Sequence, residues 1–212
     1  MPLPRLGADA PMVSLVSATY PDGVTVSTSS DHWDLRAALV NKAPVQFWQG
    51  DSGADSKMNT ILGAGVTPMQ GLRLGLGTAW GDLTDGAAGR YRMVNAEGDY
   101  SVGYTRFSGE ITRDRFDMPG GEHVAWGWTL QAQHTLTPRL FAHARATDIH
   151  APVLRAGEPP RVRTFRSLDT TLGFRVDPEV TMKVGYSAVS TWGAAQIDHQ
   201  AGVSLMWSRR WW

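Results

Sequence analysis

This chain contains no cysteine among its 212 residues. A disulfide framework, a thiolate metal site and a cysteine nucleophile are therefore all excluded. An excess of charge is missing as well, because 20 lysines and arginines balance 20 aspartates and glutamates. A neutral chain gives no reason to expect a phosphate-binding surface, so nucleic acid is not an expected partner.

Long apolar segments are lacking too. No stretch approaches the ~20 consecutive apolar residues that a membrane-spanning helix needs, which excludes a helical membrane protein. The first segment, Met1–Met12, contains three prolines and no apolar core of the kind that a secretory signal requires. We therefore expect that this segment does not direct export. The length allows one domain or one small-to-medium barrel.

The chain does have apolar residues at every second position, which is the pattern of a β-strand with one apolar face. Together the segments make about 11 or 12 strands of about 8 to 12 residues, a length that suits a tilted crossing of a bilayer. The clearest segments predict three hairpins, formed by residues 60–66 with 72–80, 124–136 with 140–148, and 168–176 with 179–189. Weaker strands are expected at residues 23–29, 33–40, 97–105, 108–114 and 197–208.

The connections between these strands alternate between short and long. Short turns are expected at Pro21–Gly23 or Ser30-Asp31, and at the Thr67-Pro68, Thr137-Pro138 and Asp177-Pro178 pairs. Longer polar stretches are expected at residues 50–59, 82–94, 114–123 and 150–164. Short turns on one rim and long loops on the other are typical of an outer-membrane barrel.

Two features favour a bilayer over a soluble β-sandwich or lipocalin-like barrel. The polar face of the predicted strands is mostly Gly, Ser, Thr and Gln, as expected for a narrow watery lumen. Aromatic residues near the strand ends could form the two girdles that lie at headgroup level. These aromatic residues are Trp33, Trp48, Trp80, Tyr100, Trp126, Trp128, Trp192, Trp207, Trp211 and Trp212. In the soluble alternative, the same tryptophans would be core and edge residues.

Several segments resemble hairpins from the later strands of porin-like outer-membrane proteins of Gram-negative bacteria. The segments are residues 20–24, 33–41, 65–75, 136–140 and 174–186. The resemblance implies an all-β fold, an antiparallel up-and-down transmembrane β-barrel that is either closed by this chain or incomplete. The final Trp212 matches the terminal aromatic that the barrel insertion machinery reads, whereas Arg210 stands where another aromatic is usual.

The resemblance also implies a function. It predicts passive diffusion of small polar solutes through the lumen, with outer-membrane lipid and the insertion machinery as partners and a homo-oligomer as a further option. No cofactor and no enzymatic activity are expected. Such proteins start with a signal peptide, and the larger ones have about 16 strands or more. We therefore expect residues 1–212 to be a single barrel domain that lacks N-terminal strands.

Charged residues on the polar face are the candidates for lining a pore. The set is Arg36, Arg73, Asp99, Arg145, Asp169, Arg175 and Lys183, with Asp34, Arg106 and Glu110 beside them. In the functional interpretation, these residues set the electric field of the channel. In the alternative interpretation, each of these charged residues is a solvated lumen or loop residue with no role in selectivity. Their mixed signs argue against a strongly ion-selective pore.

Catalytic and metal sites find little support in the sequence. His134 and His143 lie on neighbouring strands of one hairpin but differ in parity, so they should face opposite sides of the wall. His199, near Ser190, is the one candidate for an outer-membrane hydrolase. A barrel hydrolase or structural anchor, and a soluble β-barrel binding protein, remain the alternatives. Glycines between Gly71 and Gly77 lack the strand–loop–helix context of a phosphate cradle.

Overall fold

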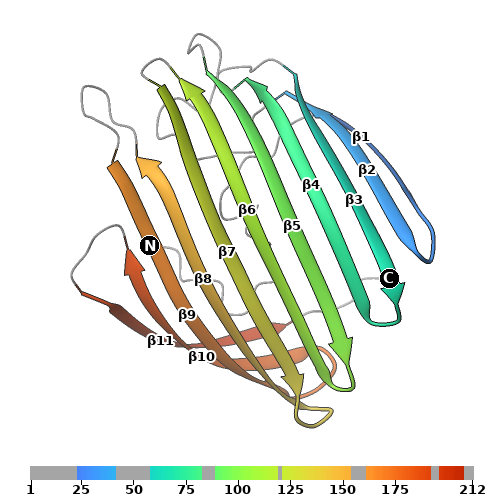
Figure 1. Cartoon of the computed structure of the whole chain (residues 1–212). Helices are drawn as coiled ribbons and strands as arrows, with labels where there is room; N and C mark the ends of the chain where they lie inside the picture. The colour runs from blue at the N-terminus through green and yellow to red at the C-terminus, as the bar shows by residue number, and fades with distance from the viewer. Residues whose placement is uncertain are drawn as a thin grey trace.

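A single antiparallel sheet makes up the described part of the molecule (Figure 1). The computed structural model describes residues 23–41, 58–82, 89–118, 121–153, 161–191 and 196–207. The 11 strands follow one another in space in the same order as in the sequence, from β1 to β11. This up-and-down order confirms the predicted all-β fold class. The described sheet is open, because β1 and β11 each have one neighbour.

The bounds of β1 and β2 match the apolar alternation, and several other strands depart from it at their ends. The strands are β1 (Gly23–Ser29), β2 (Trp33–Val40), β3 (Asn59–Met69), β4 (Leu72–Asp82), β5 (Arg90–Val102), β6 (Thr105–Met118), β7 (Gly121–Thr135), β8 (Leu140–Val153), β9 (Arg161–Arg175), β10 (Val180–Thr191) and β11 (Asp198–Trp207). In the described ranges, no helix is both long enough and apolar enough to span a membrane.

The short turns are held by side-chain oxygens that accept backbone hydrogen bonds. The Asp177 carboxylate accepts from the backbone N–H of Val180 at 2.8 Å, and the Thr137 hydroxyl accepts from that of Leu140 at 3.0 Å. Such Asx and Ser/Thr turns reverse the chain without long loops. The turns predicted at Thr137-Pro138 and Asp177-Pro178 are thereby confirmed. A further tight turn uses Gly103, whose φ of 56° favours glycine.

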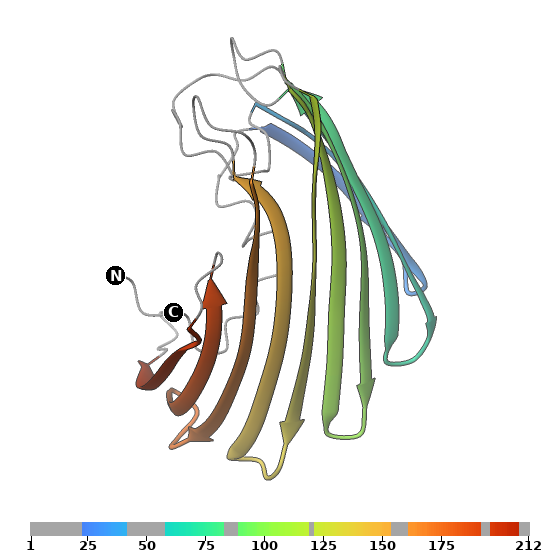
Figure 2. The same ribbon diagram turned by 60° about the vertical axis from the view of Figure 1, so that its left-hand side comes forward.

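The sheet is curved into a trough with a convex and a concave side (Figure 2). On the convex side the apolar rows are exposed, as illustrated by Leu76 at 66%, Leu130 at 59% and Val203 at 71%. A soluble sandwich or lipocalin-like barrel would bury this face, because its apolar residues fill a core. The exposed rows therefore favour an apolar surrounding for the convex face.

Aromatic residues lie near both ends of the exposed apolar band. Trp33, Tyr100 and Trp207 lie toward the short-turn rim, and Trp80 and Trp126 toward the opposite rim, all five on the convex face. Trp128, two residues from Trp126, is partly exposed on the same face. Trp48, Trp192, Trp211 and Trp212 lie outside the described residues. For these described aromatics, the positions near the two ends of the apolar band are those that two girdles would have, and their place at headgroup level stays a prediction.

Several strands extend further than the sequence predicts. Residues 90–94, 114–118, 121–123, 150–153 and 161–164 belong to strands β5 to β9 but were expected in loops. The physical reason is that the apolar alternation is inverted at several of these ends. Charged residues such as Arg92 and Arg115 take the convex face there, and apolar residues such as Tyr91 and Phe116 take the concave face. Strand β5 accordingly begins at Arg90, where the sequence predicts a start at Glu97.

The assignment of the two faces can be tested with one pair of neighbouring residues. Leu130→Arg should destabilise the sheet in a bilayer by about 2–4 kcal/mol, because it places a charge on the lipid-facing side. Gln131→Arg, one residue further along β7 on the concave side, should cost much less. Urea unfolding in phosphatidylcholine vesicles, followed by tryptophan fluorescence, measures both changes. Equal losses would contradict the assignment.

Candidate functional site: polar rows on the concave face

A continuous row of polar side chains crosses the concave face from β4 to β11. Each member lies directly opposite the next in the strand register. The row runs Arg73, Asp99, Ser108, Gln131, Arg145, Asp169, Ser187 and Gln200. A row with a polar residue on all eight strands provides hydrogen-bonding groups along the whole width of the wall.

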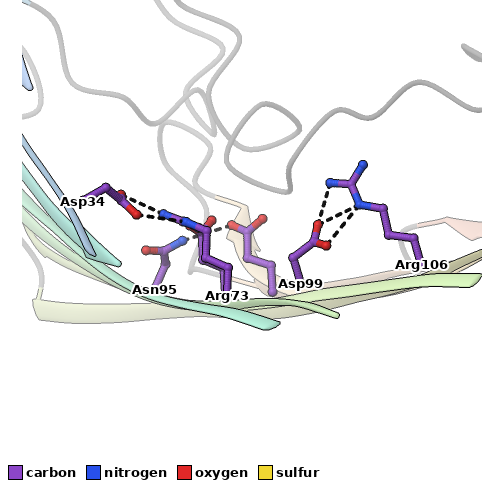
Figure 3. Close-up of polar contacts among 7 residues, drawn as sticks. Asp34, Arg73, Asn95, Asp99 and Arg106 are labelled. Atoms are coloured by element: carbon purple, nitrogen blue, oxygen red, sulfur yellow. Dashed lines mark hydrogen bonds and ion pairs between the residues drawn. The ribbon is translucent and has the colours of Figure 1, made fainter. Parts of the chain in front are cut away.

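The side chain of Arg73 binds two carboxylates that lie outside this row, on two other strands (Figure 3). Its guanidinium donates two hydrogen bonds to Asp34 of β2, at 3.0 Å from Nε and 2.9 Å from Nη2. It also pairs with Glu97 of β5. The forked geometry of arginine allows this double engagement, which a lysine could not reproduce. Three strands are thus connected by one side chain.

Glycines on β3 and β4 leave space for this bridge. A Cβ atom added at Gly65 would collide with the carboxylate of Asp34 and the guanidinium of Arg73. A Cβ added at Gly75 would press against the side chain of Glu97. Gly65 and Gly75 are directly paired in the register. The long charged side chains therefore lie flat over two positions that carry no side chain of their own.

A second ion pair lies between β5 and β6. Arg106 donates to the Asp99 carboxylate, with Nε at 2.8 Å and 3.1 Å from its two oxygens (Figure 3). One step along, Glu97 of β5 lies directly opposite Glu110 of β6. The two carboxylates are each engaged elsewhere: Glu97 pairs with Arg73, and Glu110 accepts a hydrogen bond from Asn95 at 3.4 Å.

The third charged group lies further around the wall, on β8 to β10. Arg145 and Asp169 form an ion pair at 3.2 Å, with side chains only 15% and 16% exposed. Asp169 also accepts hydrogen bonds from the hydroxyls of Ser167 and Ser187. A carboxylate with three donors around it is held in one orientation. This part of the wall thus presents fixed charge to the trough.

The remaining predicted residues are on the concave face but outside these pairs. Arg36 is exposed on β2, and in the described part of the chain it has no ion pair. Arg175 lies 5.4 Å from the centre of the Phe141 ring and donates to the carbonyl of Pro138 at 3.0 Å. Lys183 lies between Gly173 and Ser204 in the register. Every predicted pore-lining residue therefore shares the one face, although only some are brought together.

Glu97, Asn95 and Gln131 were missed as site residues. Parity could have found Glu97, since it lies two residues from Asp99 and must share its face. Arg73 was predicted to line the pore, but its pairing with Asp34 and Glu97 could not be predicted, because a bridge across three strands depends on register and not on spacing along the chain. Glu97 completes the Asp34–Arg73 bridge, so it belongs with the predicted set.

Toward the long-loop rim the concave face is apolar, which corrects the expectation of a uniformly polar wall. Buried Tyr91, Met93, Phe116 and Ile149 form a cluster there, together with small alanines. Asp114 lies among them, 2% exposed, and one of its carboxylate oxygens has no hydrogen-bond partner. The wall therefore has two zones, a charged one near the short turns and an apolar one near the opposite rim.

The histidines singled out in the sequence are not brought together, whereas His150 lies 3.0 Å from the Asp148 carboxylate and 3.4 Å from the Thr164 hydroxyl. His143 is buried on the concave side and His134 is exposed on the other, which confirms the predicted opposite facing. The His199 ring bonds the Tyr186 hydroxyl at 2.6 Å. Ser190 lies opposite Arg166 in the register. Within the described residues, no group of three or more potential ligands could hold a metal ion.

Comparison with solved structures identifies the architecture. One porin structure superposes with a TM-score of 0.66 at 10% sequence identity, covering 87% of this chain. An anion-selective porin from Comamonas acidovorans gives a TM-score of 0.63 at 14% identity and covers 86% of this chain. This is a porin-like β-barrel fold. No protein-family model matches the sequence, and no curated protein matches it significantly.

The porin-like sheet is shorter than the barrels that it resembles. The aligned region spans 60% of the first porin and 54% of the second. In this porin-like sheet the charged pairs face the concave side and the apolar rows face outward, as a channel wall in lipid requires.

The Arg73 bridge can be tested by removing its cation. Arg73→Gln should lower the free energy of unfolding by about 1 kcal/mol, a modest loss because the paired side chains are nearly two-fifths exposed and solvent screens them. Arg36→Gln is the matched control, since it removes a neighbouring concave-face arginine that has no ion pair with any described residue. Denaturant midpoints in vesicles measure both. An equal loss in the control would show that the bridge adds nothing.

Proposed function

We propose that this chain forms the wall of an outer-membrane channel through which small polar solutes diffuse passively. The observation that carries the proposal is the polar row from Arg73 to Gln200, which lies back to back with exposed apolar rows on the same strands. A wall with these two faces separates lipid from water. It needs no cofactor and no covalent step to pass solutes.

The charged pairs are better suited to letting solutes pass than to binding them tightly. Asp34, Arg73 and Glu97 satisfy one another across the strands, as do Asp99 and Arg106. A solute moving past such pairs meets fixed dipoles that exchange hydrogen bonds with it but do not form a deep cage. Small hydrated solutes, limited by size, are therefore the substrate class that we propose.

The balance of signs suggests weak ion selectivity. The concave face carries both acidic and basic groups in the charged zone, and most of them are paired. Arg36 and Lys183 are basic residues of the concave face that have no ion pair with any described residue, and Glu110 on β6 is an acidic one that accepts hydrogen bonds from Asn95 and Thr112. Because neither sign dominates, we propose that anions and cations pass at similar rates, unlike in a pore with a ring of one charge.

The same proposal covers location and partners. The exposed apolar band and the two aromatic levels support a bilayer location. Short turns at one rim, and connections at the other rim that are longer everywhere except between β6 and β7, support the outer membrane. We further propose that additional strands complete the barrel, with lipid as the partner of the convex face. Assembly by the insertion machinery and a homo-oligomeric state belong to this proposal as well.

Conductance in planar bilayers tests the proposed channel. The detergent-purified protein should produce discrete steps, and its reversal potential in a potassium chloride gradient should lie near zero because the signs are balanced. A protein that is silent at every voltage, or that is soluble and monodisperse without detergent, would contradict the proposal.

Charge removal from the wall should move the reversal potential in a set direction. Glu97→Gln with Asp99→Asn leaves excess positive charge on the concave face, so the channel should become anion-selective. Arg36→Gln with Lys183→Gln should shift it toward cations. Arg113→Gln, on the convex face of β6, should leave the reversal potential unchanged and serves as the control. Shifts of the same sign in both double variants would exclude these residues from the pore.

A further inference from the structure

Three arginines gather on the convex face of β5 and β6, toward the long-loop rim. Arg92 lies directly opposite Arg115 in the strand register, and Arg113 is two residues from Arg115 on the same face. All three side chains are exposed. We call Arg92, Arg113 and Arg115 the arginine cluster. The net charge of the chain does not reveal this cluster, because the cluster is a local excess of positive charge in a chain that is neutral overall.

The cluster is not neutralised by its neighbours. Like charges directly opposite one another destabilise a sheet. In the part of the chain that the structure describes, Arg92 and Arg113 have no ion pair, and Arg115 has one loose contact of 3.9 Å with Glu122. These positions therefore place positive charge where the sheet itself supplies little compensation.

Two other arginines on the convex face have acidic neighbours. Arg90 lies between Asp82 and Asp117 in the register, and Arg166 is 3.4 Å from the Asp148 carboxylate. The contrast shows that acidic partners are available at this rim and are placed beside Arg90 and Arg166. Within the described residues, the three arginines of the cluster share a single loose acidic contact, from Arg115 to Glu122.

The surroundings of the cluster mark its depth in the bilayer. Trp80 lies opposite Arg92, and Trp126 lies opposite Arg113. The next convex-face residues toward the membrane are Val94 and Ile111, 57% and 54% exposed. Tryptophans at the border of an apolar band lie at the level of lipid headgroups. The guanidinium groups are thus at the height where lipid phosphates are found.

We propose that the arginine cluster binds the phosphate groups of an anionic lipid in the outer leaflet. Guanidinium groups make forked, charge-assisted hydrogen bonds to phosphate oxygens, and three of them can surround one diphosphorylated headgroup. Free phosphate has the same chemistry, but the two tryptophans and the apolar residues beneath favour a ligand with acyl chains. The inference rests on the proposed membrane location and goes beyond the channel activity.

Lipid binding by the detergent-solubilised full chain tests this site. The probes are diphosphorylated lipid A, the same lipid without its phosphates, and inorganic phosphate alone, with affinity measured by native mass spectrometry. The variant Arg92→Gln, Arg113→Gln, Arg115→Gln should bind diphosphorylated lipid about 100-fold more weakly, because each arginine adds to the attraction of an anionic headgroup. The control Arg90→Gln, Arg139→Gln, Arg166→Gln removes the same charge and should bind like the original protein.

The outcomes separate this site from the channel. The proposal is overturned if the cluster variant binds as tightly as the original, if the lipid without phosphates binds equally well, or if inorganic phosphate binds as tightly as the lipid. A cluster variant that changes oligomer size and not lipid affinity overturns it as well, by making this face a protein interface. Channel conductance of the cluster variant should be unchanged. Arginine-dependent binding in detergent by a protein without conductance would retain the lipid site and refute the channel alone.

Discussion

The structure depends on one constraint, the strict two-residue alternation of side chains in strands that are paired in register. Because residues directly opposite share a face, a row of eight polar residues forms on one side without any residue being close in sequence to its neighbour. A register shift of a single residue in any strand would turn its charged groups to the lipid side. The same alternation therefore produces both the apolar convex face and the polar concave face.

In the charged zone, residues with no side chain or a small one leave room for the ion-paired residues. Gly65 and Gly75 contribute no side chain. The Arg73 guanidinium and the Asp34 carboxylate lie over Gly65, and the side chain of Glu97 lies over Gly75. Serines around Asp169 act in a similar way, since their small hydroxyls can bond the carboxylate without displacing Arg145. The charged groups are consequently fixed mainly by partners on neighbouring strands, with Ser167 adding a contact along β9.

Much of this could be predicted from the sequence, and the reasons for the rest are physical. Apolar alternation set the bounds of β1 and β2, and the parity of Asp99 and Arg145 placed them on the correct face. The ends of β5 to β9 were missed because the apolar alternation is inverted at several of them, with charged residues on the convex face, although the backbone ladder continues. Glu97 was missed beside Asp99, and the apolar zone around Tyr91 and Phe116 was missed because those residues are scattered in sequence. Both the charged group around Glu97 and the apolar zone form because the strand register brings together residues that are distant in sequence.

The open sheet described above has a consequence for how a barrel can be completed. Every neighbouring pair is antiparallel, so after ten reversals β11 points in the same direction as β1. Joining these two edges directly would require a parallel pair, and a second copy inserted in the same orientation would present the same mismatch at each seam. An all-antiparallel barrel therefore has to place an odd number of further strands between β11 and β1, whichever polypeptide segment supplies them.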